Sequence, residues 1–174
     1  GTALYDGSIS ETHFVSAIDN NQRGYDYHYD ALNRIKNANY NGNHPVAGLS
    51  SVNEDFSLDE MSYDKNGNIL GLTRTGIRLN TADQAINVGA IDDFVYSYTP
   101  GTNQLKNVVD SSVDDGYNDG NNTSNPDFEY DLSGNLVKDR NKGITSIEYN
   151  YMNLPKKIIF HGNDANISGA GIIE

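Results

Sequence analysis

A short motif recurs along this sequence, and every copy has the composition of a strand that runs into a turn. The two clearest copies lie at 128–136 (FEYDLSGNL) and 147–155 (IEYNYMNLP). In both, an alternating apolar segment ends in Tyr and then Asp or Asn, two variable residues follow, and Gly or Asn comes next. Such alternation places rings on one face of a strand and carboxylates on the other. The motif therefore predicts a β-hairpin whose first strand ends at the tyrosine.

The residues after each tyrosine carry the chemistry of a turn. Asp and Asn accept hydrogen bonds from backbone N–H groups ahead of them, and Gly and Asn tolerate positive φ. We therefore predict positive φ at the Gly or Asn position of four copies, and a return strand after each. The motif residues are Tyr29, Asp30 and Asn33; Tyr63, Asp64 and Gly67; Tyr130, Asp131 and Gly134; and Tyr149, Asn150 and Asn153. A looser copy, with Tyr98 and Asn103, has Thr99 in place of Asp and is one residue longer.

The copies together predict the fold class. A two-stranded hairpin is marginal in water, so each hairpin needs a neighbour. Tyr130 and Tyr149 are 19 residues apart, which indicates a unit of about 20 residues that insertions lengthen elsewhere. We expect an all-β fold, a curved antiparallel sheet of stacked hairpins. It would form a single repeat domain over 1–174, part of a longer array, with a flexible insertion loop at 110–127, which is rich in Asp, Asn and Gly.

Two local predictions follow from the pattern of side chains. Between 75 and 91 the sequence allows a helical turn over 81–86 or a small extra hairpin with apolar residues at 77, 79, 86 and 88. The alternation also predicts that Phe128 and Tyr130 are more buried than Glu129 and Asp131. By the same argument the residues at 147 and 149 are expected to be more buried than those at 148 and 150.

Composition excludes several classes of function. Lys and Arg total 12 against 24 Asp and Glu, a formal charge of −12. Nucleic acids and anionic membrane surfaces are bound by cations, so neither is an expected partner. No apolar segment approaches the roughly 20 residues of a membrane-spanning helix. There is no Cys, hence no disulfide or thiol chemistry. We expect no cofactor.

The groups of acidic residues that could form a metal or catalytic site can also be explained without any such function. Asp114, Asp115, Asn118 and Asp119 have the oxygen ligands that Ca²⁺ prefers, but their spacing does not match an EF-hand, which favours a solvated loop. Asp92 and Asp93 are adjacent acids, and carboxylates also occur at 129, 131 and 148. A glycosidase needs two carboxylates that face each other across a pocket, whereas neighbours in a strand face opposite ways. We therefore predict no catalytic residue and no enzyme.

The motif resembles a known repeat. The segments 29–35 (YDALNRI) and 130–136 (YDLSGNL) are similar to the Rhs repeat, also called the YD repeat, and the resemblance extends from about Tyr25 to Phe160. Such repeats build β-strips that spiral into a hollow shell around the toxic segment of bacterial Rhs toxins and toxin complexes. In teneurins a similar shell serves cell-surface adhesion.

The resemblance implies a non-catalytic segment of the shell of a larger, toxin-bearing protein, bacterial and secreted or on the cell surface. Neighbouring repeats, an enclosed toxin cargo or a surface glycan would be its partners. Tyrosine rings also stack on sugars, so the alternative is a carbohydrate-binding or adhesion surface of exposed tyrosines and polar loops. The other interpretation is that the tyrosines join neighbouring strands.

Overall fold

The computed structural model describes residues 4–42, 44–46, 49–79, 85–112, 116–117, 126–161 and 170–173. Within them the secondary structure is β-strand without helix, and the strand pairs are antiparallel. The predicted all-β class with antiparallel sheets is confirmed. The chain divides into two compact units, one of Gly1–Val95 with Asp110–Tyr117 and one of Tyr96–Val109 with Asn118–Glu174. The single repeat domain stays a prediction.

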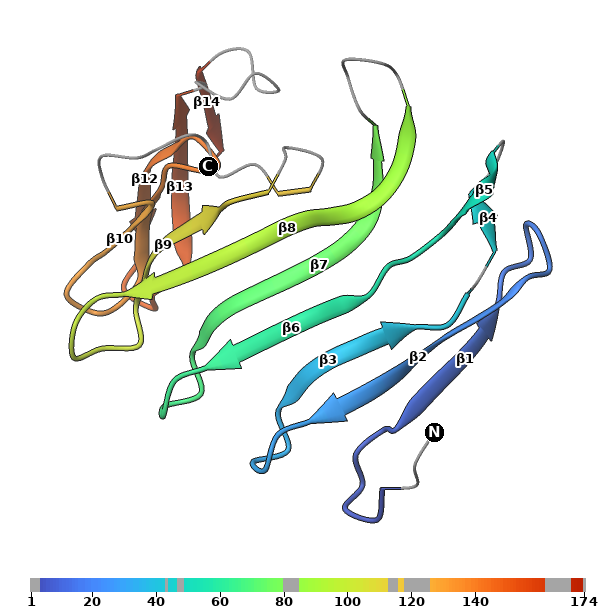
Figure 1. Cartoon of the computed structure of the whole chain (residues 1–174). Coiled ribbons are helices and arrows are strands. Elements are labelled where there is room, and N and C mark those ends of the chain that lie inside the picture. Colours follow the sequence, from blue (N-terminus) through green and yellow to red (C-terminus); the bar gives the residue numbers. More distant parts are fainter. Residues whose placement is uncertain are drawn as a thin grey trace. The chain divides into compact units, whose positions relative to one another are not determined.

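The first unit is built on strands that pair in the order β1-β2-β3-β6-β7-β8 (Figure 1). They are β1 (Glu11–Val15), β2 (Gln22–Tyr29), β3 (Ile35–Tyr40), β6 (Leu58–Tyr63), β7 (Ile69–Leu79) and β8 (Ile86–Tyr98). Only the step from β3 to β6 joins strands that are not consecutive in the chain. The short ladder of β4 (Pro45–Val46) and β5 (Leu49–Asn53) fills that interval. The sheet is thus assembled almost entirely from hairpins.

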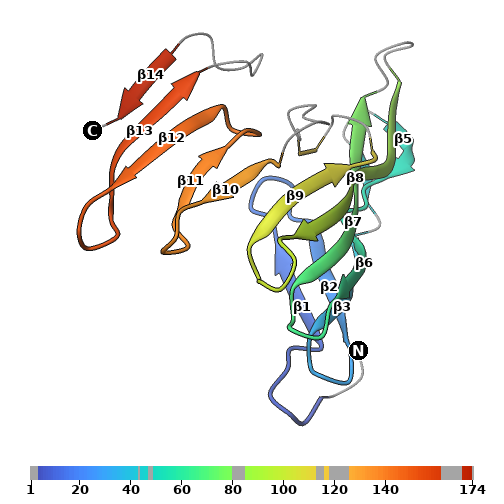
Figure 2. The same cartoon turned by 90° about the vertical axis from the view of Figure 1, so that its left-hand side faces the viewer.

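The second unit begins within β8. It contains most of β9 (Leu105–Asp110), which pairs with β8, and a five-stranded sheet with the order β10-β11-β12-β13-β14 (Figure 2). Those strands are β10 (Phe128–Tyr130), β11 (Leu136–Asp139), β12 (Ile144–Tyr149), β13 (Pro155–His161) and β14 (Ala170–Ile173). Asp127 links the two parts of this unit. Its side chain is buried, and Oδ2 accepts a hydrogen bond from the N–H of Val108 in β9 (2.7 Å).

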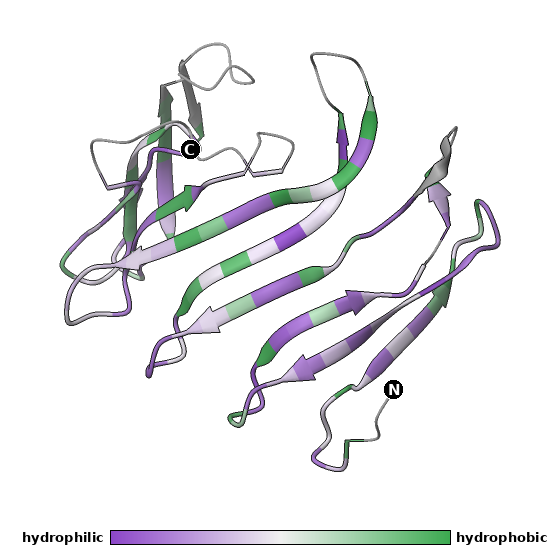
Figure 3. Ribbon diagram, in the orientation of Figure 1, coloured by the Kyte–Doolittle hydropathy of each residue, from purple (hydrophilic) through white to green (hydrophobic). Residues whose placement is uncertain are grey.

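The hairpin of β7 and β8 settles the structure expected around 75–91. Ile77 pairs with Val88, and Leu79 pairs with Ile86. The extra-hairpin alternative is therefore correct for these residues, and the tip at 80–84 lies outside the described part of the chain. Figure 3 shows hydrophobic and hydrophilic residues interspersed along both strands, and they alternate strictly near the tip, at 77–79 and 86–88.

Half-buried aromatic rings, rather than a large aliphatic interior, pack the first unit. Tyr25 stacks on Tyr27, with ring centroids 6.1 Å apart, and meets Tyr40 edge-on at 5.4 Å. Tyr40 in turn meets Phe56 edge-on at 5.3 Å. Among the described residues of this unit, the buried apolar side chains are Ala38, Val46 and Phe94. Tyrosine supplies much of the packing because its hydroxyl can still reach a polar partner.

The predicted burial order holds against Glu148 in β12 and is not resolved for Asn150 or in β10. In β12, Ile147 and Tyr149 are half-buried and Glu148 is exposed, but Asn150 is half-buried because it starts the turn. In β10 the four residues from Phe128 to Asp131 are all half-buried. Glu129 has this environment because the Arg140 guanidinium and the Lys138 amine (3.0 Å) pair with it.

Candidate functional site

The motif tyrosines occupy one structural position. Each is the last residue of its strand, as predicted: Tyr29 in β2, Tyr63 in β6, Tyr98 in β8, Tyr130 in β10 and Tyr149 in β12. The Asp or Asn that follows then organises the turn. In the first copy, Asp30 Oδ1 accepts hydrogen bonds from the N–H groups of Leu32 (2.8 Å) and Arg34 (3.0 Å). The same two bonds, to the second and fourth residues onward, form at Asp64, Asp131 and Asn150.

The turn closes through a residue with positive φ. The φ angles are 58° at Asn33, 89° at Gly67, 85° at Gly134 and 57° at Asn153, so the prediction is confirmed at all four positions. The N–H of this residue donates to the carbonyl of the turn Asp or Asn in each copy, at 3.0 to 3.2 Å. Gly and Asn occupy the position because other L-residues adopt this conformation at a cost.

A β-bulge follows every one of these four turns. Tyr29 pairs with Ile35 but His28 pairs with Asn37, so Lys36 is an extra residue in β3. The same shift occurs beside Tyr63, Tyr130 and Tyr149. A bulge bends its strand and increases the local twist, so the motif encodes a bend as well as a turn.

The turn between β8 and β9 is built differently from the other four. This looser copy was outside the φ prediction, and its positive φ (76°) belongs to Gly101 and not to the motif residue Asn103. Thr102 donates its N–H to the Thr99 carbonyl (3.0 Å), and Pro100-Gly101 has the sequence of a type II turn. Thr99 has no carboxylate, so the Thr102 hydroxyl takes part instead by accepting the N–H of Gln104 (3.1 Å).

The side chain of the residue after the positive-φ position donates hydrogen bonds to Oδ2, the second carboxylate oxygen of the turn aspartate. Arg34 pairs with Asp30 Oδ2 (2.6 Å), and in the later copies Asn68 and Asn135 donate to Oδ2 of their aspartates at 2.8 and 2.9 Å. These side chains are the main reason that the pKa of Asp30, of Asp64 and of Asp131 lies below its usual value. Sequence reasoning missed this role, although a donor at that position in three copies was a visible signal.

The tyrosine hydroxyls connect one hairpin to the preceding one. Tyr63 donates to the carbonyl of Ile35 (2.8 Å), and Tyr149 donates to the carbonyl of Leu136 (2.7 Å). Each acceptor lies two residues after the positive-φ residue of the preceding turn. Tyr29 makes the same contact with Ile9 (2.9 Å), two residues after Gly7, whose φ is 91°. We call this contact the tyrosine tie.

Side chains of successive turns also touch. The Arg34 guanidinium lies 4.4 Å from the centre of the Tyr63 ring, and its Nη1 donates to the Asp64 carbonyl (3.1 Å). In the second unit, Asn135 donates to the side-chain carbonyl of Asn153 (3.1 Å). The turns of neighbouring hairpins are thus joined to each other as well as closed internally.

Asp92 and Asp93 face opposite sides of β8, as predicted for neighbours in a strand. Asp92 is fully buried, pairs with the Arg74 guanidinium and accepts the N–H of Tyr117 on Oδ1 (2.7 Å). Asp93 is exposed and accepts the Thr73 hydroxyl (3.2 Å). The Tyr117 ring meets Phe94 edge-on at 5.4 Å. Asp92 therefore anchors Tyr117 to β8.

The weak Ca²⁺ candidate, Asp114, Asp115, Asn118 and Asp119, lies outside the described residues, as does most of the 110–127 insertion. Among the residues that the structure describes, no three His, Cys, Asp or Glu side chains gather as metal ligands would. Nor does that part of the chain contain a helix with the length and hydropathy of a membrane span.

Neither a scan against protein-family models nor a search of curated proteins found a match. The resemblance to the Rhs repeat stays a prediction.

Proposed function

We propose that this chain is a non-catalytic structural segment of an Rhs- or YD-repeat shell, which encloses a cargo or forms a cell-surface scaffold in a larger, secreted bacterial protein. The observation that carries the proposal is the tyrosine tie. Tyr63 and Tyr149 each bond to the strand that follows the preceding turn, and Tyr29 bonds to Ile9, which lies just before β1. In these copies the motif supplies its own contact to the preceding hairpin. Added copies can therefore extend the array by repeating the same contact, as a wall of repeats requires.

The polar groups of the motif support a structural role because they are already engaged. The carboxylate of each turn aspartate accepts bonds within its own turn, and the three tie hydroxyls donate to backbone carbonyls. The recurring bulges bend each hairpin at the same place, as a curved strip of stacked hairpins would need. Neighbouring repeats are then the first partners of this chain.

The proposal that the shell encloses a cargo can be tested by protease cleavage of the full-length protein. One variant carries a site for a sequence-specific protease in the exposed tip at Tyr151, and others carry it in segments outside the repeats. We expect the tip to be cut in the native protein, because the Tyr151 side chain is 94% exposed, and at least one other segment to be cut only after denaturation. Equal cutting of every site in the native protein would contradict enclosure.

A further inference from the structure

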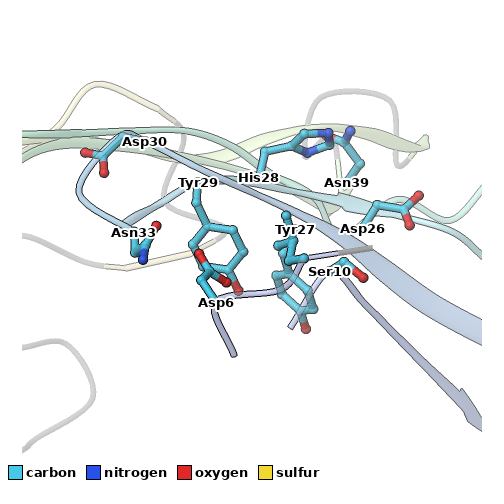
Figure 4. Close-up of a pocket in the computed structure, with 10 residues that line it drawn as sticks. Asp6, Ser10, Asp26, Tyr27, His28, Tyr29, Asp30, Asn33 and Asn39 are labelled. Carbon is cyan, nitrogen blue, oxygen red and sulfur yellow. The ribbon is translucent and has the colours of Figure 1, made fainter. Parts of the chain in front are cut away.

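A sulfur atom also contacts the hydroxyl that makes the tyrosine tie of Tyr63. This hydroxyl lies 2.8 Å from the Ile35 carbonyl oxygen and 3.0 Å from the Met61 sulfur. Met61 and Tyr63 are two residues apart in β6, so their side chains share one face of the sheet. Figure 4 shows the equivalent pair in β2, where Tyr27 and Tyr29 project to the same side of the strand. The fold therefore places a second acceptor beside this tie.

The two acceptors compete for one proton. A hydroxyl has a single O–H, so it donates fully to one partner at a time. A thioether sulfur is a weak acceptor and a backbone carbonyl is a strong one, so the carbonyl of Ile35 holds the proton in the unmodified chain. Burial raises the pKa of Tyr63, which keeps its hydroxyl protonated and able to donate at neutral pH. The outcome of the competition thus depends on how strongly the sulfur group accepts.

Oxidation of the sulfur reverses this preference. Hydrogen peroxide transfers one oxygen atom to a methionine sulfur: an S–O bond forms, the O–O bond breaks, the sulfur gives up an electron pair and the peroxide is reduced to water. The product is a polar sulfoxide, whose oxygen accepts hydrogen bonds far more strongly than a thioether. Because that oxygen is bonded to the atom that already contacts the Tyr63 hydroxyl, it forms within reach of the same proton.

The tie from Tyr63 lies at the one join of this sheet between strands that are not consecutive in the chain. β3 and β6 pair at Ala38 and Leu58, and Leu58 is the first residue of β6 whereas Tyr63 is the last. Nearer the turn, the two hairpins are joined by the tie and by Arg34, which lies 4.4 Å from the Tyr63 ring centre and donates to the Asp64 carbonyl (3.1 Å). A change at the Tyr63 hydroxyl therefore acts where side chains, and not a long ladder, hold the strands.

We propose that Met61 is a reversible oxidation site whose sulfoxide captures the Tyr63 hydroxyl and releases the tie to Ile35. The equivalent positions in two other copies hold Phe128 and Ile147, which have no sulfur to oxidise. The switch is therefore specific to the join between β3 and β6. It goes beyond the structural function proposed above and does not depend on it.

Carbonyl NMR of the whole chain tests the proposal, because the shift of the Ile35 carbonyl carbon responds to the hydrogen bond that the oxygen accepts. The chain is treated with hydrogen peroxide, and peptide mass spectrometry measures the sulfoxide at Met61 and Met152, the two methionines of the sequence. Tyr63→Phe gives the Ile35 shift without the tie. Met61→Leu, a volume-conserving change, leaves Met152 as a 56% exposed control for oxidation elsewhere.

We expect Met61 to be oxidised in the folded chain, more slowly than Met152 because it is half-buried. The Ile35 shift should then move to its value in Tyr63→Phe, and it should return when a methionine sulfoxide reductase restores the thioether. Peroxide should leave the Ile35 shift unchanged in Tyr63→Phe and in Met61→Leu.

Three results would overturn the proposal. The first is a Met61 that stays unoxidised while Met152 is converted. The second is an Ile35 shift that does not reach the Tyr63→Phe value once Met61 is a sulfoxide. The third is an equal movement of the Ile35 shift when either variant is oxidised, because the effect would then come from Met152 or from the sulfoxide without the hydroxyl.

Discussion

Replacing Tyr149 by Phe isolates the tyrosine tie. The change removes one hydroxyl and leaves the ring, so the packing of β12 is preserved. The lost bond joins the hydroxyl to the Leu136 carbonyl at 2.7 Å, the usual distance for an O–H···O bond, in a partly buried place. A neutral hydrogen bond contributes about 0.5–1.5 kcal/mol net. Because water can partly replace the donor at this half-buried site, we expect a loss of about 1 kcal/mol.

Tyr151→Phe is the matched control. It makes the same chemical change two residues away, at a side chain that is 94% exposed, where a change within about 0.5 kcal/mol is expected. In a unit of roughly 70 residues, 1 kcal/mol lowers the melting temperature by about 4–8 °C. Urea unfolding followed by circular dichroism, with thermal unfolding as a second readout, measures both variants. Equal stabilities of Tyr149→Phe and Tyr151→Phe would refute the view that the tie joins the hairpins.

Three further predictions concern the turns and the buried aspartate. Gly134→Val should cost about 1 kcal/mol or more because φ is 85°, whereas Gly134→Asn should be nearly neutral by urea unfolding; equal costs would contradict the turn assignment. Gly116→Ala would bring a Cβ into the Asp92 carboxylate and should cost about 1–3 kcal/mol, with faster hydrogen exchange at Tyr117; unchanged exchange would argue against the anchor. The fold lowers the pKa of Asp131, so its stabilising contribution is complete above the ordinary Asp pKa of about 3.9 and declines as the pH falls through the lower folded value. Asp131→Asn should therefore flatten the loss of stability below about pH 4, and an unchanged acid profile would contradict this.

The turns could be predicted because their chemistry is local. Whether Asp30 accepts the N–H groups ahead of it, and whether Asn33 takes positive φ, depends on a few consecutive residues. The turn after Tyr98 shows the limit of this reasoning. This copy lacks the Asp and is one residue longer, so the motif made no φ prediction for it, and Pro100-Gly101 forms the turn ahead of Asn103.

The ties could not be predicted in the same way, because they depend on the register between hairpins. Ala38 pairs with Leu58 across an interval that the β4–β5 ladder fills, and this pairing brings Tyr63 to Ile35. A pattern over a few consecutive residues cannot predict this contact, because Ile35 and Tyr63 are far apart in the sequence. The half-burial of Glu129 in β10 could not be predicted for a related reason, since the cations that pair with it come from the return side of the hairpin.

The central claim is that this chain is one stretch of a wall of hairpins, and a cryo-EM structure of the full-length protein tests it most directly. The free edge of β1, the terminal strand of its sheet among the described residues, should then pair with a strand of a neighbouring repeat. The ties from Tyr29, Tyr63 and Tyr149 should continue in adjacent copies along a strip that closes around a cavity. A β1 edge that faces solvent, in a chain that folds as an isolated domain beside the rest of the protein, would contradict the account.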